Sequence, residues 1–247
     1  MTIILQPHAE IILENLNNNY LIIQNQVGDA KVMGVIKADA YGHGAIEVAK
    51  SLSQTKIHGF CVALIKEIID LRENGINKPI LHLGKLPASS IDIFNGNTIC
   101  TINSFEDIEN IQNYFINNGV KIPAHIKFDT GMGRMGFHYS QAEQVLKKIH
   151  GCEAINLEGI YSHFSTAEEA DITFMELQRF RFDEIVKFSK LLFSNLSYHI
   201  SNSAGIFQDP RNHYDMVRPG ITLYGVTPFG TTHEKLKPVM HLKAPVV

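Results

Sequence analysis

The 247-residue sequence has little excess charge, few cysteines and no long apolar run, and each shortage excludes a class of protein. A net charge of −3, with basic residues spread along the chain, argues against binding to nucleic acid or to an anionic membrane. Three widely spaced cysteines, Cys61, Cys100 and Cys152, fit neither a disulfide framework nor a zinc site, so we expect a cytoplasmic protein. No apolar run approaches the length of a membrane span, and the first residues lack the positive start of a signal peptide.

Metal-ligand patterns are also missing. The 12 histidines are scattered, and none forms a His-x-x-x-His pair that would place two ligands on one helical face. We therefore expect no metal. The remaining composition, 45% hydrophobic and 19% charged, is typical of a folded globular domain.

The chain repeats one pattern, in which a short apolar run is followed by a turn and then by a helical stretch. After an opening helix over about 12–27, the apolar runs lie at 31–36, 59–63, 79–83, 98–102, 124–128, 157–161, 197–201 and 221–224. One helical stretch begins after Ser104, which we expect to cap it together with Asp107. Strands that alternate with helices imply a parallel sheet, and eight units in roughly 220 residues predict an α/β fold, a (β/α)8 TIM-type barrel. An open doubly wound sheet is the alternative, because periodicity does not distinguish closure.

The two ends of the chain do not fit the barrel pattern. The piece before the first helix and the last stretch, residues 237–247, are both strand-like. We expect both to pair with a further β-rich domain. The predicted division is a barrel over residues 1–236, with residues 237–247 as the start of a truncated C-terminal β domain.

Barrel enzymes carry their working groups at the C-terminal ends of the strands, so the residues just after each apolar run are the candidates. Lys37 follows the first run, and a lysine leaving an apolar strand is partly desolvated, which frees its amine to attack an aldehyde. Tyr41 follows with a hydroxyl donor. Taken alone, a lysine at this place is more often a solvated edge residue.

Later strand ends supply further candidates, each with an ordinary structural alternative. The glycine-rich loop at 127–136 could turn Arg134 inward as a fork for a carboxylate or phenolate, or leave it on the surface. His163 follows the sixth run and could equally be a hydrogen-bonded core histidine. After the seventh run come Asn202 and Ser203, at a helix start that could bind an anion or be an ordinary N-cap. Ser203 with Gly220 and Ile221, around the start of the eighth run, would lie where barrels often bind a phosphate, with Arg218 beside them.

At these residues the sequence resembles the alanine racemase family. The segment 37–44, KADAYGHG, is similar to the family's cofactor-lysine motif. The segments 127–136, 161–169, 202–204 and 218–221 match in the same order, so the resemblance covers essentially the whole chain. It implies an N-terminal eight-stranded barrel that binds pyridoxal 5′-phosphate (PLP) and interconverts L-alanine and D-alanine, which supplies D-alanine for peptidoglycan.

The resemblance also implies a role for each candidate residue. Lys37 would bind PLP as a Schiff base and act as one of two catalytic bases. Arg134 would contact the cofactor's phenolic oxygen and the substrate carboxylate, braced by Lys127, which is often carbamylated in the family. His163 would lie near the pyridine ring and link to Arg218. The remaining cofactor-binding residues would be Tyr41, Asn202, Ser203, Gly220 and Ile221.

Arg218 would point at the pyridine nitrogen, and this explains the expected reaction. An arginine stays charged and does not easily give up a proton, so the ring nitrogen stays unprotonated and is a weaker electron sink. Transamination should be limited, and exchange of the α-proton remains as the main outcome.

The sequence departs from the family in length. The resemblance implies a homodimer in which a tyrosine from the partner's C-terminal β domain is the second base, and the expected truncation removes that base. The isolated chain should therefore bind PLP weakly and racemise little. A stand-alone PLP-binding barrel without racemase turnover is one alternative, and a metabolite-binding barrel without PLP is another. Preference for alanine over serine stays open, because related serine racemases share these motifs.

Overall fold

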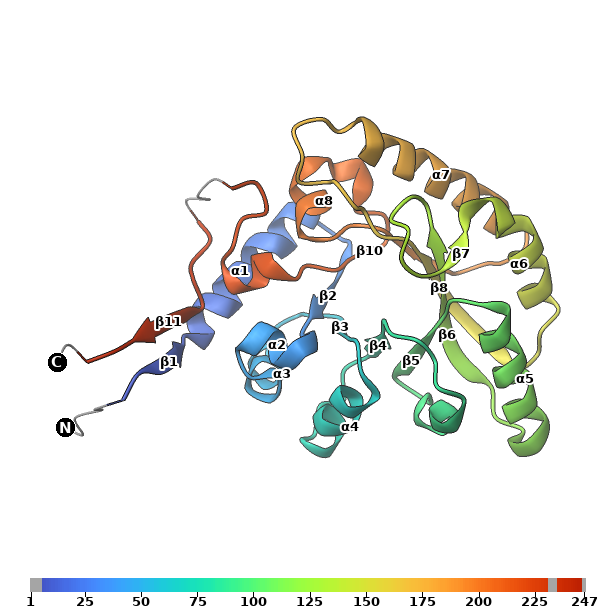
Figure 1. Ribbon diagram of the computed structural model, residues 1–247, viewed down its shortest axis with the longest axis horizontal. Coiled ribbons are helices and arrows are strands. Elements are labelled where there is room, and N and C mark those ends of the chain that lie inside the picture. Colours follow the sequence, from blue (N-terminus) through green and yellow to red (C-terminus); the bar gives the residue numbers. More distant parts are fainter. Residues whose placement is uncertain (1–5, 231–234, 246–247) are drawn as a thin grey trace.

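A computed structural model describes residues 6–230 and 235–245, and its centre is a parallel barrel surrounded by helices (Figure 1). Every strand of the barrel runs parallel to its neighbours. Around the sheet the strands are β10 (Met216–Val217), β2 (Lys31–Val35), β3 (Gly59–Val62), β4 (Ile80–His82), β5 (Thr98–Ile102), β6 (Ile122–Asp129), β8 (Ile155–Tyr161) and β9 (Ser197–His199), while the short β7 (Phe137–His138) pairs with β6.

Backbone hydrogen bonds bring the last strands together. The N–H of Asp215 donates to the carbonyl of Tyr198 at 3.1 Å, and the N–H of Arg218 donates to the carbonyl of Ser201 at 3.0 Å. Because these bonds lie beside β9 and β10, the two ends of the sheet meet and the ring is nearly closed. The predicted barrel is therefore confirmed, and an open doubly wound sheet is excluded.

Helices cover the outside of the barrel (Figure 1). They are α1 (Leu13–Val27), α2 (Lys37–Gly42), α3 (Ala45–Ser53), α4 (Ile65–Glu73), α5 (Phe105–Asn118), α6 (Ala142–His150), α7 (Thr173–Ser189) and α8 (Ser203–Gln208), with single 3₁₀ turns η1 (Ala88–Ile93), η2 (Tyr139–Gln141), η3 (Pro210–Asn212) and η4 (Ile221–Tyr224). Ser104 caps α5 as expected: its Oγ accepts the N–H of Asp107 at 3.2 Å. None of the helices in the described part of the chain has the length and apolar character to span a bilayer.

The core has two layers that follow from strand alternation. A small cluster including Met33, Cys61 and Leu81 fills the inside of the barrel. A larger cluster packs the outer strand faces against the helices, and Leu16, Tyr20 and Ile23 of α1 belong to it. Alternate residues of each strand therefore pack into opposite layers. The residues at the strand ends are then available to form a binding site.

The prediction of a strand at 221–224 is wrong. These residues form the 3₁₀ turn η4, and the eighth barrel strand is β10, which lies before them. Thr222, Leu223 and Tyr224 are all buried, a pattern that fits a wedged turn better than an alternating strand. Asn19 of α1 donates to the carbonyl of Leu223 at 3.0 Å and holds the turn in place. The other seven predicted strands are confirmed within a few residues.

The two strand-like ends pair with each other. β1 (His8–Ile11) and β11 (Met240–Lys243) form an antiparallel ribbon at one side of the barrel (Figure 1). The expected pairing of each with a further β-rich domain stays a prediction. The division into residues 1–236 and 237–247 stays a prediction, and residues 1–5, 231–234 and 246–247 lie outside the described residues.

Candidate active site

A cavity of about 510 Å³ opens at the C-terminal ends of the barrel strands. It is lined by every site residue predicted from the sequence: Lys37, Tyr41, Arg134, His163, Asn202, Ser203, Arg218, Gly220 and Ile221. Lys127 lines it as well. The strand-end rule thus brought together residues from segments nearly 190 positions apart, between Lys37 and Ile221.

Lys37 leaves β2 into an unusual backbone turn. Its four successors, Ala38–Tyr41, have φ values of 52°, 51°, 54° and 56°, so all four lie in the left-handed region although none is glycine. Such a conformation costs about 1–2 kcal/mol per residue relative to the right-handed one. Strain of this kind persists only where surrounding contacts fix it, and it marks the turn as a site that the fold maintains at a cost.

Tyr41, Gly220 and Ser203 meet at one end of the cavity. A Cβ at position 220 would lie 2.8 Å from the Tyr41 hydroxyl, so only glycine allows this approach. The Ser203 Oγ accepts the N–H of Gly220 at 3.0 Å and that of Thr222 at 3.3 Å. Because these bonds occupy its acceptor positions, the hydroxyl has one proton left to donate, and the cavity is where an acceptor could meet it.

Asn202 prepares this end of the cavity by fixing the start of α8. Its Oδ1 accepts the N–H of Gly205 at 3.0 Å, and its Nδ2 donates to the carbonyl of Phe164 at 3.2 Å. A side chain that caps a helix and also reaches the next strand end holds both segments together. Ser203, the following residue, is thereby placed.

Arg218 is buried, with 3% of its surface exposed. Its Nη2 donates to the carbonyl of Ser162 at 2.7 Å and approaches His163 Nδ1 at 3.3 Å, and its Nη1 bonds His199 Nδ1. Burial lowers the pKa of the guanidinium, yet arginine remains charged at neutral pH. Among the described residues its partners are carbonyls and imidazoles, so this buried charge is solvated by dipoles.

The charge on Arg218 fixes the proton positions on the histidines behind it. A guanidinium only donates, so His199 Nδ1 must accept, and the proton of His199 sits on Nε2. That N–H then faces His125 Nδ1 at 2.8 Å. Burial, and after it the charge of Arg218, holds the pKa of His163 and His199 well below the usual range and lowers that of His125 to about 3. All three rings are neutral.

Lys127 and Arg134 complete a strongly cationic lining. Burial, helped by the charges of Arg134 and Arg218, lowers the pKa of Lys127 to about 8, and its ammonium lies 5.8 Å from the centre of the Tyr161 ring. Asp129 shapes the loop that carries Arg134: its carboxylate accepts the N–H groups of Gly131 and Arg134 at 2.8 and 3.0 Å. Among the described residues of the lining, Glu168 is the one carboxylate against four cationic side chains.

Comparison with known proteins agrees with this geometry. A sequence model of the family described as "Alanine racemase, N-terminal domain" matches residues 11–228. This match covers most of the chain. The chain belongs to the alanine racemase N-terminal domain family.

Relatives in this family are similar over nearly the whole chain. The alanine racemase of Carboxydothermus hydrogenoformans is 39% identical over 96% of the chain and 66% of its own length, and that of Clostridium kluyveri is 38% identical over 96% and 62%. The structure of alanine racemase from Clostridium difficile 630 aligns with a TM-score of 0.90 at 37% identity over 98% of this chain and 65% of that one. A structure from Bartonella henselae, described as having covalently bound pyridoxal phosphate, gives 0.88 at 29% identity over 97% and 69%. The chain thus spans slightly less than two thirds of the length of these curated relatives.

Sequence reasoning missed the residues by which α7 supports the site of this alanine racemase domain. Gln178 is fully buried; its Nε2 donates to the carbonyl of His163 at 3.0 Å, and its Oε1 accepts the N–H of Ser165 at 3.0 Å. Arg181 donates to the carbonyl of Thr130 at 2.7 Å, in the loop that leads to Arg134. The signal available in the sequence was the position of Gln178 at helical spacing from the apolar Met175, Phe182 and Ile185.

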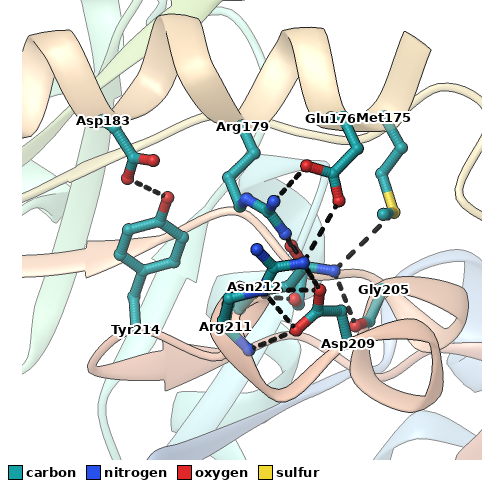
Figure 2. Close-up of polar contacts among 10 residues, drawn as sticks. Met175, Glu176, Arg179, Asp183, Gly205, Asp209, Arg211, Asn212 and Tyr214 are labelled. Atoms are coloured by element: carbon teal, nitrogen blue, oxygen red, sulfur yellow. Dashed lines mark hydrogen bonds and ion pairs between the residues drawn. The ribbon is translucent and has the colours of Figure 1, made fainter. Parts of the chain in front are cut away.

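A second set of contacts joins α7 to the segment after α8 (Figure 2). Arg179, 7% exposed, donates to Asp209 at 3.1 Å and also pairs with Glu176, while Arg211 binds the same Asp209 from the solvent side. Nearby, the Tyr214 hydroxyl donates to Asp183 at 2.6 Å. In this alanine racemase domain α8 carries Ser203, so the network anchors the far end of the segment that lines the cavity.

Proposed function

We propose that this chain is the cofactor-binding domain of a PLP-dependent alanine racemase, which interconverts L-alanine and D-alanine. The observation that carries the proposal is the convergence of Lys37, Arg134, His163 and Arg218 on one cavity that also holds Tyr41, Ser203 and Gly220. The relatives, named alanine racemases, and the neighbour with covalently bound pyridoxal phosphate support it.

The cavity fits PLP in charge and in shape. The cofactor brings a phosphate and a phenolate, and four cationic side chains face the cavity. The end formed by Tyr41, Ser203, Gly220 and Ile221 suits the phosphate, because it offers hydroxyl donors beside a backbone that lacks a side chain. The cationic lining would thus be neutralised by the ligand.

Each side chain then has a defined task. The Lys37 amine would bind the cofactor aldehyde covalently and afterwards hold and return the substrate's α-proton. Arg134 would orient the substrate carboxylate through its planar fork. Lys127, as a carbamate, would turn from a cation into an anion and brace Arg134. When bound, PLP supplies an electron sink that stabilises the deprotonated α-carbon.

Arg218 sets the limits of that sink. The guanidinium is buried, stays charged and would donate a hydrogen bond to the pyridine nitrogen without transferring its proton. His163 and His199 are neutral, and their Nδ1 atoms accept N–H groups of Arg218, so the nitrogens that face the guanidinium hold no proton to pass to it. We therefore infer that proton exchange at the α-carbon is favoured over transamination.

The whole protein would work as a homodimer in the cytoplasm, with a tyrosine from the partner's C-terminal domain as the second base. Its product would serve peptidoglycan synthesis. The substrate is a small amino acid, alanine rather than serine by the names of the relatives.

Reductive trapping tests the cofactor assignment. The chain mixed with PLP should acquire visible absorption that borohydride removes, and peptide mapping should place the reduced adduct on Lys37. Lys127 is the competing amine in the same cavity, because its pKa is lowered to about 8 and its neutral, nucleophilic form is more accessible than that of an ordinary lysine. Lys37→Ala should abolish the adduct, and Lys127→Ala should keep it. An adduct mapped to Lys127, or one retained in Lys37→Ala, refutes the assignment.

A further inference from the structure

The left-handed turn after Lys37 requires something to hold it. Its first residue, Ala38, is exposed, and its third, Ala40, is fully buried, so packing fixes only part of the turn. The carbonyl of Ile36 accepts the N–H of Ala40 at 2.9 Å. An exposed alanine has no reason of its own to stay left-handed, and the lysine in front of it depends on that backbone.

A carboxylate from the neighbouring unit of the barrel reaches Ala38. Glu67 lies in the first turn of α4, and its Oε1 accepts the N–H of Ala38 at 2.6 Å. Its Oε2 accepts the N–H groups of Ala63 and Leu64 at 2.8 and 3.0 Å, at the start of its own helix. One oxygen therefore caps α4, and the other binds the residue directly after Lys37.

Separate hydrogen bonds fix the C-terminal side of the turn. Asp39 Oδ1 accepts the N–H of Ala45 at 2.7 Å, at the beginning of α3, and the carbonyl of Asp39 accepts the N–H of Gly44 at 3.0 Å. These bonds are local, since they join residues five or six positions apart. Glu67 differs because it connects the end of β2 to the end of β3.

The chain contains a natural comparison for Glu67. Asp107 occupies the same place in α5, and its Oδ2 accepts the N–H groups of Asn103 and Ser104 at 2.7 and 3.0 Å. This repeats the capping pattern of Glu67 with a side chain one methylene shorter, and among the described residues it includes no bond to a neighbouring strand end. Capping alone thus requires only an aspartate, and the additional methylene of Glu67 allows its carboxylate to bind the N–H of Ala38 as well.

We propose that Glu67 is a positioning residue for Lys37: its carboxylate holds the left-handed turn that aims the lysine into the cavity. The inference rests on the proposed function, in which Lys37 binds PLP. Glu67 touches neither cofactor nor substrate and acts through the Ala38 N–H. Without that bond the turn would sample right-handed backbone, and the root of the lysine side chain would point away from the cofactor aldehyde for part of the time.

Glu67→Asp separates the two roles of this side chain. The shorter carboxylate can still cap α4 through Ala63 and Leu64, but it no longer reaches the N–H of Ala38. Amide hydrogen exchange on the cofactor-free chain should show faster exchange at Ala38 and unchanged exchange at Ala63 and Leu64. The PLP concentration for half-maximal attachment to Lys37 should rise by about tenfold or more, the effect of losing one hydrogen bond to a charged group.

Two further variants make the test specific. Asp107→Ala removes a cap of the same kind far from Lys37, so it should lower the unfolding midpoint without changing PLP attachment. Ala38→Gly combined with Glu67→Asp should recover part of the lost attachment, because glycine adopts the left-handed region without a Cβ penalty. If Glu67→Asp does not fold, Glu67→Gln, which retains one acceptor oxygen, takes its place with the same expected direction.

The outcomes separate the two proposals. Wild-type exchange at Ala38 and wild-type PLP attachment in the folded Glu67→Asp chain overturn the positioning role. An equal loss of attachment in Asp107→Ala also overturns it, because general destabilisation would then be sufficient. If the wild-type chain attaches no PLP while Glu67→Asp speeds amide exchange at Ala38, the proposed function is wrong, but the stabilisation of the turn by Glu67 is confirmed.

Discussion

The side chains behind Arg218 show how one buried charge sets the state of its neighbours. Tyr161 stacks on His199 with ring centres 4.8 Å apart and donates to Thr101 Oγ1, because Thr101 gives its own proton to the carbonyl of His82. Burial raises the pKa of Tyr161 to about 12. This tyrosine therefore keeps its proton at neutral pH and is a poor base despite lining the cavity.

The neutral histidines should make the fold sensitive to mild acid. In the unfolded chain His125, His163 and His199 take up protons near pH 6.5, whereas the folded chain resists protonation because their pKa values are lowered. Unfolding then takes up protons, so the free energy of unfolding falls as pH drops below about 6.5. Each histidine contributes up to about 1.4 kcal/mol per pH unit.

Denaturant unfolding between about pH 7 and pH 5 measures this slope. His125→Gln should reduce it by up to about one proton, with the exposed His150→Gln as the matched control. A slope that His125→Gln does not alter would mean that the folded barrel accepts the proton, contrary to the neutral chain of imidazoles.

How far the sequence predicts the site depends on the range of each interaction. Lys37 and Arg134 could be found because each follows a strand, and strand ends converge in any parallel barrel, while Arg218 was found in the loops around the last two strands, where barrels often bind phosphate. Gln178 could not, because its partners His163 and Thr130 lie 15 and 48 positions away. The left-handed turn was also missed, since Ala38 and Ala40 are poor candidates for that conformation in any local rule.

At the level of elements, α7 is the support on which several site segments rest. Through Gln178 and Arg181 it holds the loops after β6 and β8, and through Arg179 it holds the segment after α8 (Figure 2). The apolar residues Phe182, Ile185 and Val186 recur along the sequence at helical spacing. The polar contacts of α7 depend on which strand ends lie above it, and that is settled only when the barrel closes.

The misassigned strand at 221–224 illustrates the same limit. Four consecutive residues with strand-like composition favour an extended segment, yet Asn19 and Ser203 bind the backbone of η4 and fix it as a turn. The real strand β10 has two paired residues, too few to show any alternation.

Asp209 should dominate the attachment of α8 to α7. Asp209→Asn is expected to lower the free energy of unfolding by about 2 kcal/mol at neutral pH, because buried Arg179 loses a charged acceptor and keeps Glu176 and the neutral Oδ1 of Asn212. Arg211→Ala is the matched control: it removes a partner of the same carboxylate on the exposed side, so it should cost less than about 1 kcal/mol.

The pH dependence gives this prediction a second check. Hydrogen bonding by Arg211, and then by Arg179, lowers the pKa of Asp209 to about 2, below its value of 3.8 in the unfolded chain. A carboxyl with a lowered pKa stabilises the fold above about pH 4, and the contribution is lost as pH falls toward 2. In Asp209→Asn the free energy of unfolding should therefore depend less on pH in that range. An unchanged pH dependence would contradict the ion pairing assigned to Asp209.

At the scale of the whole molecule, cofactor binding can be considered apart from racemisation. The residues that we propose to hold PLP line one cavity, while the chain spans 62–66% of the length of relatives named alanine racemases. Racemisation requires proton transfer on both faces of the α-carbon. Lys37 serves one face, and by our proposal a tyrosine from the partner's C-terminal domain serves the other.

The 247 residues alone, loaded with PLP, should therefore exchange the α-proton of one alanine enantiomer with deuterium from solvent much faster than they form the other enantiomer. Lack of one general acid–base group lowers turnover by about 10²–10⁴-fold. The reference is a fusion that adds the C-terminal third of the Carboxydothermus hydrogenoformans relative, and proton NMR in D₂O with chiral chromatography separates exchange from inversion. Equal racemisation by the chain and the fusion would place the second base within the barrel itself, and Tyr161 and Glu168, which line the cavity with Lys37, would become the groups to substitute next.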